Sequence, residues 1–138
     1  MENLATTDIK PKNVLLILMA ALLIPLAIFL PLAADSWENT ISVNEAGISV
    51  SGSGGFDLSW EEIESMELVE ELPQLKPHTR KYLKGDFETK EGQVIRLVIN
   101  GEAPFILIST GGKKFFFNRH YSKNTKEDFL KLQSNMRP

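Results

Sequence analysis

The side chains best suited to acid–base or metal chemistry are few in this chain. It contains two histidines, His78 and His120, and no cysteine. A zinc site needs three or four ligands, so these histidines would have to combine with carboxylates from distant segments. We therefore expect no metal centre and no bound cofactor.

Serine-based and phosphate-binding motifs are also incomplete. The run Ser51–Gly55, SGSGG, lacks the Gly-Lys-Ser/Thr ending of a phosphate-binding loop and precedes a predicted strand instead of a helix. Its central Gly52-Ser53-Gly54 is one residue too tight for a nucleophile elbow. The run predicts a hairpin connection, and we expect the protein not to be an enzyme. An uncharacterised envelope hydrolase is one alternative; it would require a deep pocket in which His78 or His120 lies beside carboxylates.

Charged side chains are unevenly distributed. Residues 35–75 contain ten Asp and Glu and no Lys or Arg, whereas residues 76–138 contain thirteen basic and six acidic residues. Such halves can attract each other within one domain or solvate opposite faces. The functional alternative is a basic edge, formed by Lys76, Arg80, Lys81 and Lys84, that binds anionic lipid headgroups or an acidic partner. Nucleic acid is not an expected partner, because the net charge is −3 and no nucleic-acid-binding motif is present.

Two further features are candidates for partner contact. The run Phe115-Phe116-Phe117 puts aromatic side chains on both faces of a predicted strand. Burial under a terminal helix accounts for two of them and leaves Phe116 as a candidate exposed contact patch. The segment Glu70–His78, EELPQLKPH, has no periodicity and is predicted to cross between two sheets as an extended linker. Long loops often carry function, so it is the next candidate contact region.

The N-terminal part of the chain predicts a membrane anchor. The run Val14–Ala34 carries no charged side chain, and at about 1.5 Å per residue it matches the roughly 30 Å hydrocarbon core of a bilayer. It divides the chain into a short N-terminal segment, 1–13, a transmembrane helix, 14–34, and one domain, 35–138.

Basic residues predict the orientation of this anchor. Lys10 and Lys12 precede the apolar run, and the next basic residue is Lys76. By the positive-inside rule the segment 1–13 is cytoplasmic and the domain is extracytoplasmic. A domain facing the cytoplasm is an alternative. A cleaved secretory signal ending in the small residues of Ala33-Ala34-Asp35-Ser36 is another, but the apolar run is longer than the usual signal core, which favours an uncleaved anchor.

The remainder predicts a mainly β domain. Short runs rich in β-branched and aromatic residues are separated by Gly, Asn and Ser. In the first three runs the apolar residues alternate, so we expect them to line one core. The predicted strands are Thr40–Val43, Ile48–Ser51, Phe56–Ser59, Ile63–Val69, Leu83–Glu88, Val94–Asn100, Phe105–Thr110 and Lys113–Asn118.

Turns and the C-terminal pattern complete the predicted fold. Thr110-Gly111-Gly112-Lys113 predicts a hairpin with a primed turn, and Leu83 to Asn118 predicts an antiparallel meander of four strands. Residues 121–136 carry an apolar residue every three or four positions, which predicts a terminal helix. Thr125 to Asp128 resembles a capping box for that helix. Strands closed by one helix give a small rolled sheet or partly open barrel.

Several strings in the domain carry a family resemblance. They are Gly47-Ile48, Trp60-Glu61-Glu62-Ile63, Glu67-Leu68-Val69, Leu72-Pro73, Thr79-Arg80, Lys84-Gly85-Asp86-Phe87, Pro104–Ile108 and Thr110–Phe115. In order and spacing across Ile41 to Leu132, they resemble the bacterial pleckstrin-homology-like (PH-like) domains, which often follow one or two membrane spans. The resemblance implies a seven-stranded antiparallel roll capped by a C-terminal helix, with no enzymatic activity and no shared ligand. The acidic first hairpin, Val43–Ile48, lacks the basic residues with which phosphoinositide-binding PH domains hold phosphate.

Together these features predict a single-pass membrane protein with an extracytoplasmic PH-like domain. We expect it to act as a non-catalytic binding or assembly module near the membrane, with a protein partner. The sequence does not identify that partner, the pathway or the oligomeric state.

Overall fold

The computed structural model describes residues 10–34 and 37–136. The chain forms two compact units, residues 1–33 and 34–138, which are described separately. Most of the predicted cytoplasmic segment and the Asp35-Ser36 end of the alternative cleavage site lie outside the described residues.

The first unit contains one helix, α1 (Pro11–Ala34), of 24 residues. It begins three residues before the predicted span, with Pro11 at its first position, where the missing proline N–H would have no helical acceptor. Its apolar side chains are exposed throughout the described part, for example Leu22 at 73% and Phe29 at 67%. Within the described residues, α1 alone is long and apolar enough to cross a membrane, a property that a signal sequence near an N-terminus shares. The predicted apolar helix is confirmed.

The second unit contains eight strands followed by one helix. All eight predicted strands are present, with ends that shift by at most two residues. They are β1 (Ile41–Val43), β2 (Gly47–Val50), β3 (Phe56–Ser59), β4 (Ile63–Val69), β5 (Lys84–Glu88), β6 (Val94–Val98), β7 (Phe105–Thr110) and β8 (Lys114–Phe117), followed by α2 (Ser122–Asn135).

The strands form two open sheets and no closed barrel. The first has the order β1-β2-β3 with antiparallel pairing throughout, and the second has the order β4-β7-β8-β6-β5. The predicted four-stranded meander is wrong, because β8 lies between β7 and β6 and pairs with β6 in parallel. The connection from β6 to β7 therefore crosses the end of β8. There the buried Asn118 side chain accepts from the Asn100 and Gly101 N–H groups and donates to the Gly101 carbonyl oxygen.

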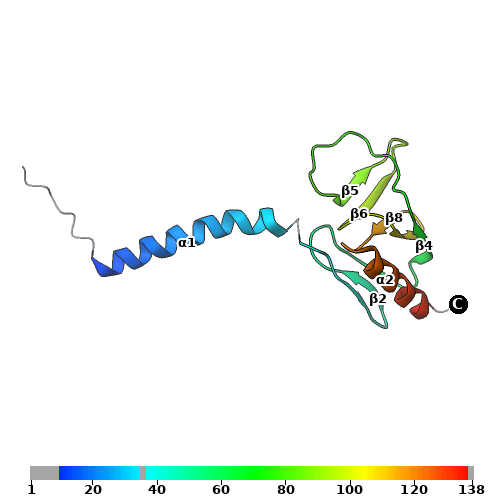
Figure 1. Cartoon of the computed structure of the whole chain (residues 1–138), viewed down its shortest axis with the longest axis horizontal. Helices are drawn as coiled ribbons and strands as arrows, with labels where there is room; N and C mark the ends of the chain where they lie inside the picture. The colour runs from blue at the N-terminus through cyan, green and yellow to red at the C-terminus, as the bar shows by residue number, and fades with distance from the viewer. Residues whose placement is uncertain (1–9, 35–36, 137–138) are drawn as a thin grey trace, which may run out of the picture. The chain divides into compact units, whose positions relative to one another are not determined.

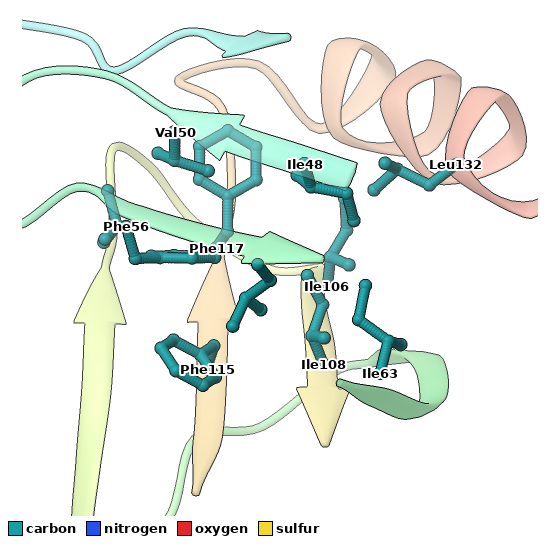
Figure 2. Close-up of a cluster of buried hydrophobic side chains, with 11 residues drawn as sticks. Ile48, Val50, Phe56, Ile63, Ile106, Ile108, Phe115, Phe117 and Leu132 are labelled. Carbon is teal, nitrogen blue, oxygen red and sulfur yellow. The ribbon is translucent and has the colours of Figure 1, made fainter. Parts of the chain in front are cut away.

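One face of the second sheet packs against the first sheet and α2, and Figure 2 shows their apolar side chains pointing toward one another. Ile48 and Val50 of β2 meet Ile106 of β7 and Phe117 of β8 in this main core, and Leu132 of α2 is fully buried against it. The prediction that the first three strands line one core is confirmed. Figure 1 shows α2 as part of the domain, where it contacts β1, β4 and β7.

The other face of the second sheet is covered by the segment between β4 and β5, residues 70–83, which we call the strap. Its Leu72 and Leu75 pack on the second core cluster, whose buried members are Phe87, Ile95, Leu97 and Phe116. The strap also extends the sheet locally, because the Lys76 N–H donates to the Glu88 carbonyl oxygen at 2.9 Å. The predicted linker between two sheets is wrong: β4 and β5 are the outer strands of one sheet, and the strap crosses that sheet's face.

The strap explains why the prediction for Phe116 is wrong. Phe116 is only 2% exposed, whereas Phe115 and Phe117 point to the opposite face and are buried in the main core. Because β8 is a central strand covered on both sides, all three phenylalanines lie inside the domain.

The predicted capping box is also wrong. The helix begins at Ser122, its N-cap is Tyr121, and no side chain caps it. Thr125 is therefore inside the helix, where its Oγ1 accepts from the Arg119 N–H at 2.9 Å. Asp128 instead forms an ion pair with Arg119 at 3.2 Å. The predicted apolar stripe holds for Thr125, Phe129, Leu132 and Met136, but Tyr121 is exposed.

The predicted β7–β8 hairpin is present with a different turn. Ser109 pairs with Lys114, and the Thr110 N–H donates to the Lys113 carbonyl oxygen at 2.9 Å, so the loop has the two expected residues. Neither Gly111 nor Gly112 has a positive φ, which a primed turn requires at its first central residue.

Burial of Phe116 gives a direct test of the strap. Phe116→Ala should lower the free energy of unfolding by about 3–5 kcal/mol, because it opens a cavity beneath Leu72 and Leu75. Urea denaturation of the detergent-solubilised protein measures this. The exposed Leu130 of α2 is the matched control, and Leu130→Ala should change stability by less than about 0.5 kcal/mol. Equal, small effects of both substitutions would contradict a covered second face.

Candidate functional site

The predicted basic edge is largely used inside the domain. Lys76 forms an ion pair with Glu88. The Arg80 guanidinium donates to the Asp86 carbonyl oxygen at 2.9 Å and to the Lys84 carbonyl oxygen, and its Cζ lies 4.3 Å from the centre of the Phe87 ring. Both carbonyls belong to the outer strand β5, whose open side would otherwise lack these partners. Arg80 therefore closes part of the sheet edge.

Lys84 is buried, at 5% exposure, and its Nζ donates to the Trp37 carbonyl oxygen. The prediction that Lys84 contacts a partner is therefore wrong, because Lys84 begins β5 with its side chain buried inside the domain. Gly85 beside it has a φ of +123°, and a Cβ there would lie 2.5 Å from Arg80 Nη2, so glycine gives the guanidinium room. Lys81 is exposed, with its Nζ 5.3 Å from the Tyr82 ring centre. The four basic residues do not form one free cationic surface.

A second group of charged side chains, on the second sheet, binds the glycine-rich loop at residues 51–55. Arg96 of β6 donates to the carbonyl oxygens of Gly54 and Gly55 at 3.1 and 3.0 Å. It also pairs with Asp86 at 2.7 Å, and Lys113 reaches the same carboxylate at 2.8 Å. The hydrogen bond from Arg96, opposed by partial burial and supported by Lys113, lowers the pKa of Asp86 to about 2. The predicted connection at 51–55 is confirmed as the β2–β3 loop.

The two histidines lie in different surroundings. The His78 ring packs edge-on against Phe87, with ring centres 5.0 Å apart. The His120 ring packs against Tyr121, and its Nδ1 lies 3.3 Å from the Asn100 carbonyl oxygen. Neither lines the two hollows described below. Across residues 10–34 and 37–136, no three His, Asp or Glu side chains are placed to hold a metal ion.

One hollow on the described surface of the domain is a groove of about 550 Å³. It lies where the β1–β2 turn, the β3–β4 turn and the end of α2 meet, and we call it the Trp60 groove. Its lining residues are Asn44, Glu45, Trp60, Ile63, Asn135 and Met136. A shallower hollow of about 290 Å³ shares Asn44 and continues along the outside of β2 and β3 to Asp57 and Glu62.

The walls of the Trp60 groove are fixed by local hydrogen bonds. Trp60 packs on the main core, and its Nε1 donates to the Asn44 carbonyl oxygen at 3.0 Å. Asn44 Oδ1 accepts from the Ala46 and Gly47 N–H groups, and Glu62 Oε2 accepts from the Ser59 N–H at 2.8 Å. The groove is thus a preformed hollow with an aromatic wall and exposed carboxylates nearby. Its chemistry suits a cationic, partly apolar ligand.

A second notable feature is the segment Trp37–Asn39 at the start of the domain, which we call the attachment segment. Glu38 Oε1 accepts from Arg119 Nε at 2.8 Å and from the His120 N–H at 2.9 Å. Although partial burial raises it, these hydrogen bonds and the Arg119 charge lower the pKa of Glu38 below its ordinary value. Trp37 is held through its carbonyl oxygen by Lys84.

Asn39 fixes the end of this segment. It is 1% exposed, and its Nδ2 donates to the carbonyl oxygens of Ser51 and Ser53 at 2.6 and 2.9 Å. Its N–H donates to Asn100 Oδ1 at 3.2 Å. The sequence prediction missed this segment because isolated Glu and Asn residues before a strand carry no periodic signal.

Comparison with known proteins gives no match: no family model, no curated protein and no solved structure matches this chain. The function is therefore inferred from the geometry above.

The Asp86 cluster predicts an acid-sensitive contribution to stability. Because the folded pKa is about 2 and the ordinary value is 3.8, this contribution is complete above about pH 4 and is lost as the pH falls toward 2. Asp86→Asn should lower stability at pH 7 and flatten its fall between pH 4 and pH 2, measured by thermal unfolding at a series of pH values. Glu91→Gln, at the exposed β5–β6 turn, is the charge-matched control. An Asp86→Asn profile that superimposes on the wild-type profile would contradict the assignment.

Proposed function

We propose that this is a single-pass membrane protein whose domain is a non-catalytic, PH-like binding module on the extracytoplasmic side. The proposal rests on one observation. An exposed apolar helix, long enough to span a bilayer, precedes a folded domain by only two residues, and the domain's own Lys84 and Arg119 hydrogen-bond to Trp37 and Glu38 at its start. At 24 residues α1 is about 36 Å long, which exceeds the hydrocarbon thickness of roughly 30 Å.

The extracytoplasmic side is supported by charge. Lys10 precedes α1 directly and Lys12 lies in its first turn, whereas residues 35–75 contain no basic residue. The positive-inside rule places such an N-terminus in the cytoplasm. A domain that faces the cytoplasm and recruits partners or anionic lipid is the alternative.

A binding role is supported by how the interior is used. Both faces of the second sheet are filled with large apolar side chains, such as Phe117 and Ile95, which are 0% exposed. An envelope hydrolase would need His78 or His120 in a pocket beside carboxylates, and both histidines lie outside the lining of the Trp60 groove. The proposal therefore assigns function to the surface of the domain.

PH-like architecture is supported by two packed sheets with a C-terminal helix on the main core. The chain differs from the implied roll in having eight strands, and in the parallel pairing of β6 with β8.

The Trp60 groove is the surface that we assign to the protein partner. Glu45 lines it, Glu62 lines the adjoining hollow, and both carboxylates are on exposed residues. The partner chemistry that fits is a basic peptide segment, whose lysine or arginine side chains can pair with carboxylates and pack over the indole of Trp60.

Membrane anchoring is tested by extraction and mass. If α1 is a retained anchor, the native protein should remain in the membrane pellet after alkaline carbonate washing, and its intact mass should equal that of the whole chain. A mature mass lacking α1 would show that the apolar helix is a cleaved signal. Release by carbonate at full mass would also overturn the anchor.

Binding at the groove is tested with Trp60 as the reporter. In a Trp37→Phe variant, Trp60 is the remaining tryptophan, and a lysine- and leucine-containing peptide should change its emission saturably and in a salt-sensitive manner. Glu45→Gln should weaken this binding by about three- to tenfold, as expected for the loss of one charge pair at a surface. Glu91→Gln removes one charge elsewhere and should leave the affinity unchanged. Absence of saturation, or equal effects of the two variants, would contradict the groove assignment.

A further inference from the structure

Two of the exposed large apolar side chains in the domain flank the contact between the attachment segment and the start of α2. Among residues 37–136, four large apolar side chains are exposed: Trp37 at 59%, Val94 at 50%, Tyr121 at 66% and Leu130 at 63%. The two aromatic ones belong to segments that lie next to each other, although they are far apart in sequence. Glu38 follows Trp37, and its carboxylate accepts from the N–H of His120, the residue before Tyr121.

This juxtaposition is held by several interactions. Arg119 bridges Glu38 at 2.8 Å and Asp128 of α2 at 3.2 Å, which ties the attachment segment to the helix. The His120 ring packs against Tyr121 with ring centres 4.6 Å apart. The Lys84 ammonium group donates to the Trp37 carbonyl oxygen. Trp37 and Tyr121 thus extend from a braced part of the domain.

The short connection to α1 limits where this part of the domain can be. Three Cα–Cα steps separate Ala34, the last residue of α1, from Trp37, so their Cα atoms are at most about 11 Å apart. The interfacial layer on each side of a bilayer is roughly 5–8 Å thick. If α1 spans the membrane, the start of the domain lies at or just outside that layer.

The exposed side chains at this position have the chemistry of membrane interfaces. Tryptophan and tyrosine are enriched at the level of the lipid headgroups, where an apolar ring and a polar group are both satisfied. Lys123, two residues after Tyr121, has a side chain that is 85% exposed and forms an ion pair with Glu127 at 3.9 Å. Because such an exposed ion pair is weak, the Lys123 ammonium group can exchange this partner for lipid phosphates.

We infer that Trp37, Tyr121 and Lys123 form a membrane-resting face, which holds the domain against the phospholipid headgroups around its own anchor. The inference rests on the proposed membrane anchor and adds a second, lipid contact to it. In this inference one face of the domain is directed toward the lipid. The Trp60 groove remains the surface assigned to the protein partner.

The test places one tryptophan at a time in the full-length protein, reconstituted into phosphatidylcholine vesicles that contain bromine-labelled acyl chains. In a Trp37→Phe, Trp60→Phe background, Tyr121→Trp reports on the membrane-resting face. Val94→Trp in the same background is the matched control, because Val94 is also exposed and apolar. Val94 begins β6, whereas Val98, at the other end of the strand, is the residue close to Asn100 and its hydrogen bond with Asn39. Vesicle flotation reports on the anchor in every sample, and a Trp60→Phe variant reports on Trp37 itself.

The expected result is that all variants float, that tryptophan at 121 emits at shorter wavelength and loses most of its emission to bromolipid, and that tryptophan at 94 loses little. Flotation with no quenching at 121, or with equal quenching at 121 and 94, would overturn the membrane-resting face while leaving the anchor intact. A failure to float would overturn the anchor itself. A blue shift at 121 that grows with protein concentration in detergent, without bromolipid quenching in vesicles, would assign the face to a second copy of the chain and overturn the lipid contact. If Tyr121→Trp does not fold, Trp37 in the Trp60→Phe variant is the reporter. Bromolipid should quench Trp37, and adding Tyr121→Ser should reduce that quenching. Unchanged quenching of Trp37 in Tyr121→Ser would contradict a shared face.

Discussion

A β-sheet with apolar side chains on both faces has to be covered twice, and this constraint organises the domain. Phe115, Phe116 and Phe117 alternate across β8, the central strand of the second sheet, so no single layer can bury all three. The first sheet and α2 cover one face, and the strap, residues 70–83, covers the other. Even the outer strand β5 is closed locally, by the strap backbone and by Arg80. Phe116 and Arg80, which the sequence pattern predicted to be available to a partner, are therefore used within the domain.

The same constraint explains how far the sequence could predict the fold. Strand periodicity depends on neighbouring residues, so all eight strands and the core formed by Ile48, Val50 and Phe56 were predictable. Strand order depends on contacts between distant segments, which is why the parallel β6–β8 pair was missed. The burial of Phe116 and Lys84 has the same origin, because a period of two shows that a strand has two faces but not that both are covered. The capping box was wrong because α2 begins at Ser122, after an N-cap Tyr121 with no capping side chain, and Thr125 Oγ1 instead accepts from the Arg119 N–H.

The two contact surfaces have different relations to local sequence. The Trp60 groove combines two turns and the end of α2, so no run of neighbouring residues predicted it. The membrane-resting face depends on Glu38, whose hydrogen bond from the His120 N–H joins the segment that carries Trp37 to the segment that carries Tyr121. One hydrogen-bonded segment, 37–39, therefore connects the proposed anchor, the glycine-rich β2–β3 loop and the base of α2. In the proposed function, the short connection to α1 would keep this segment of the domain close to the membrane.

The side of the membrane on which the domain lies is the most direct test of this function. The chain contains no cysteine, so a single cysteine introduced by Glu91→Cys at the exposed β5–β6 turn gives a unique thiol. A membrane-impermeant maleimide should label this thiol fully in intact spheroplasts, with no increase after lysis. Labelling that appears only after lysis would place the domain in the cytoplasm and contradict the extracytoplasmic module.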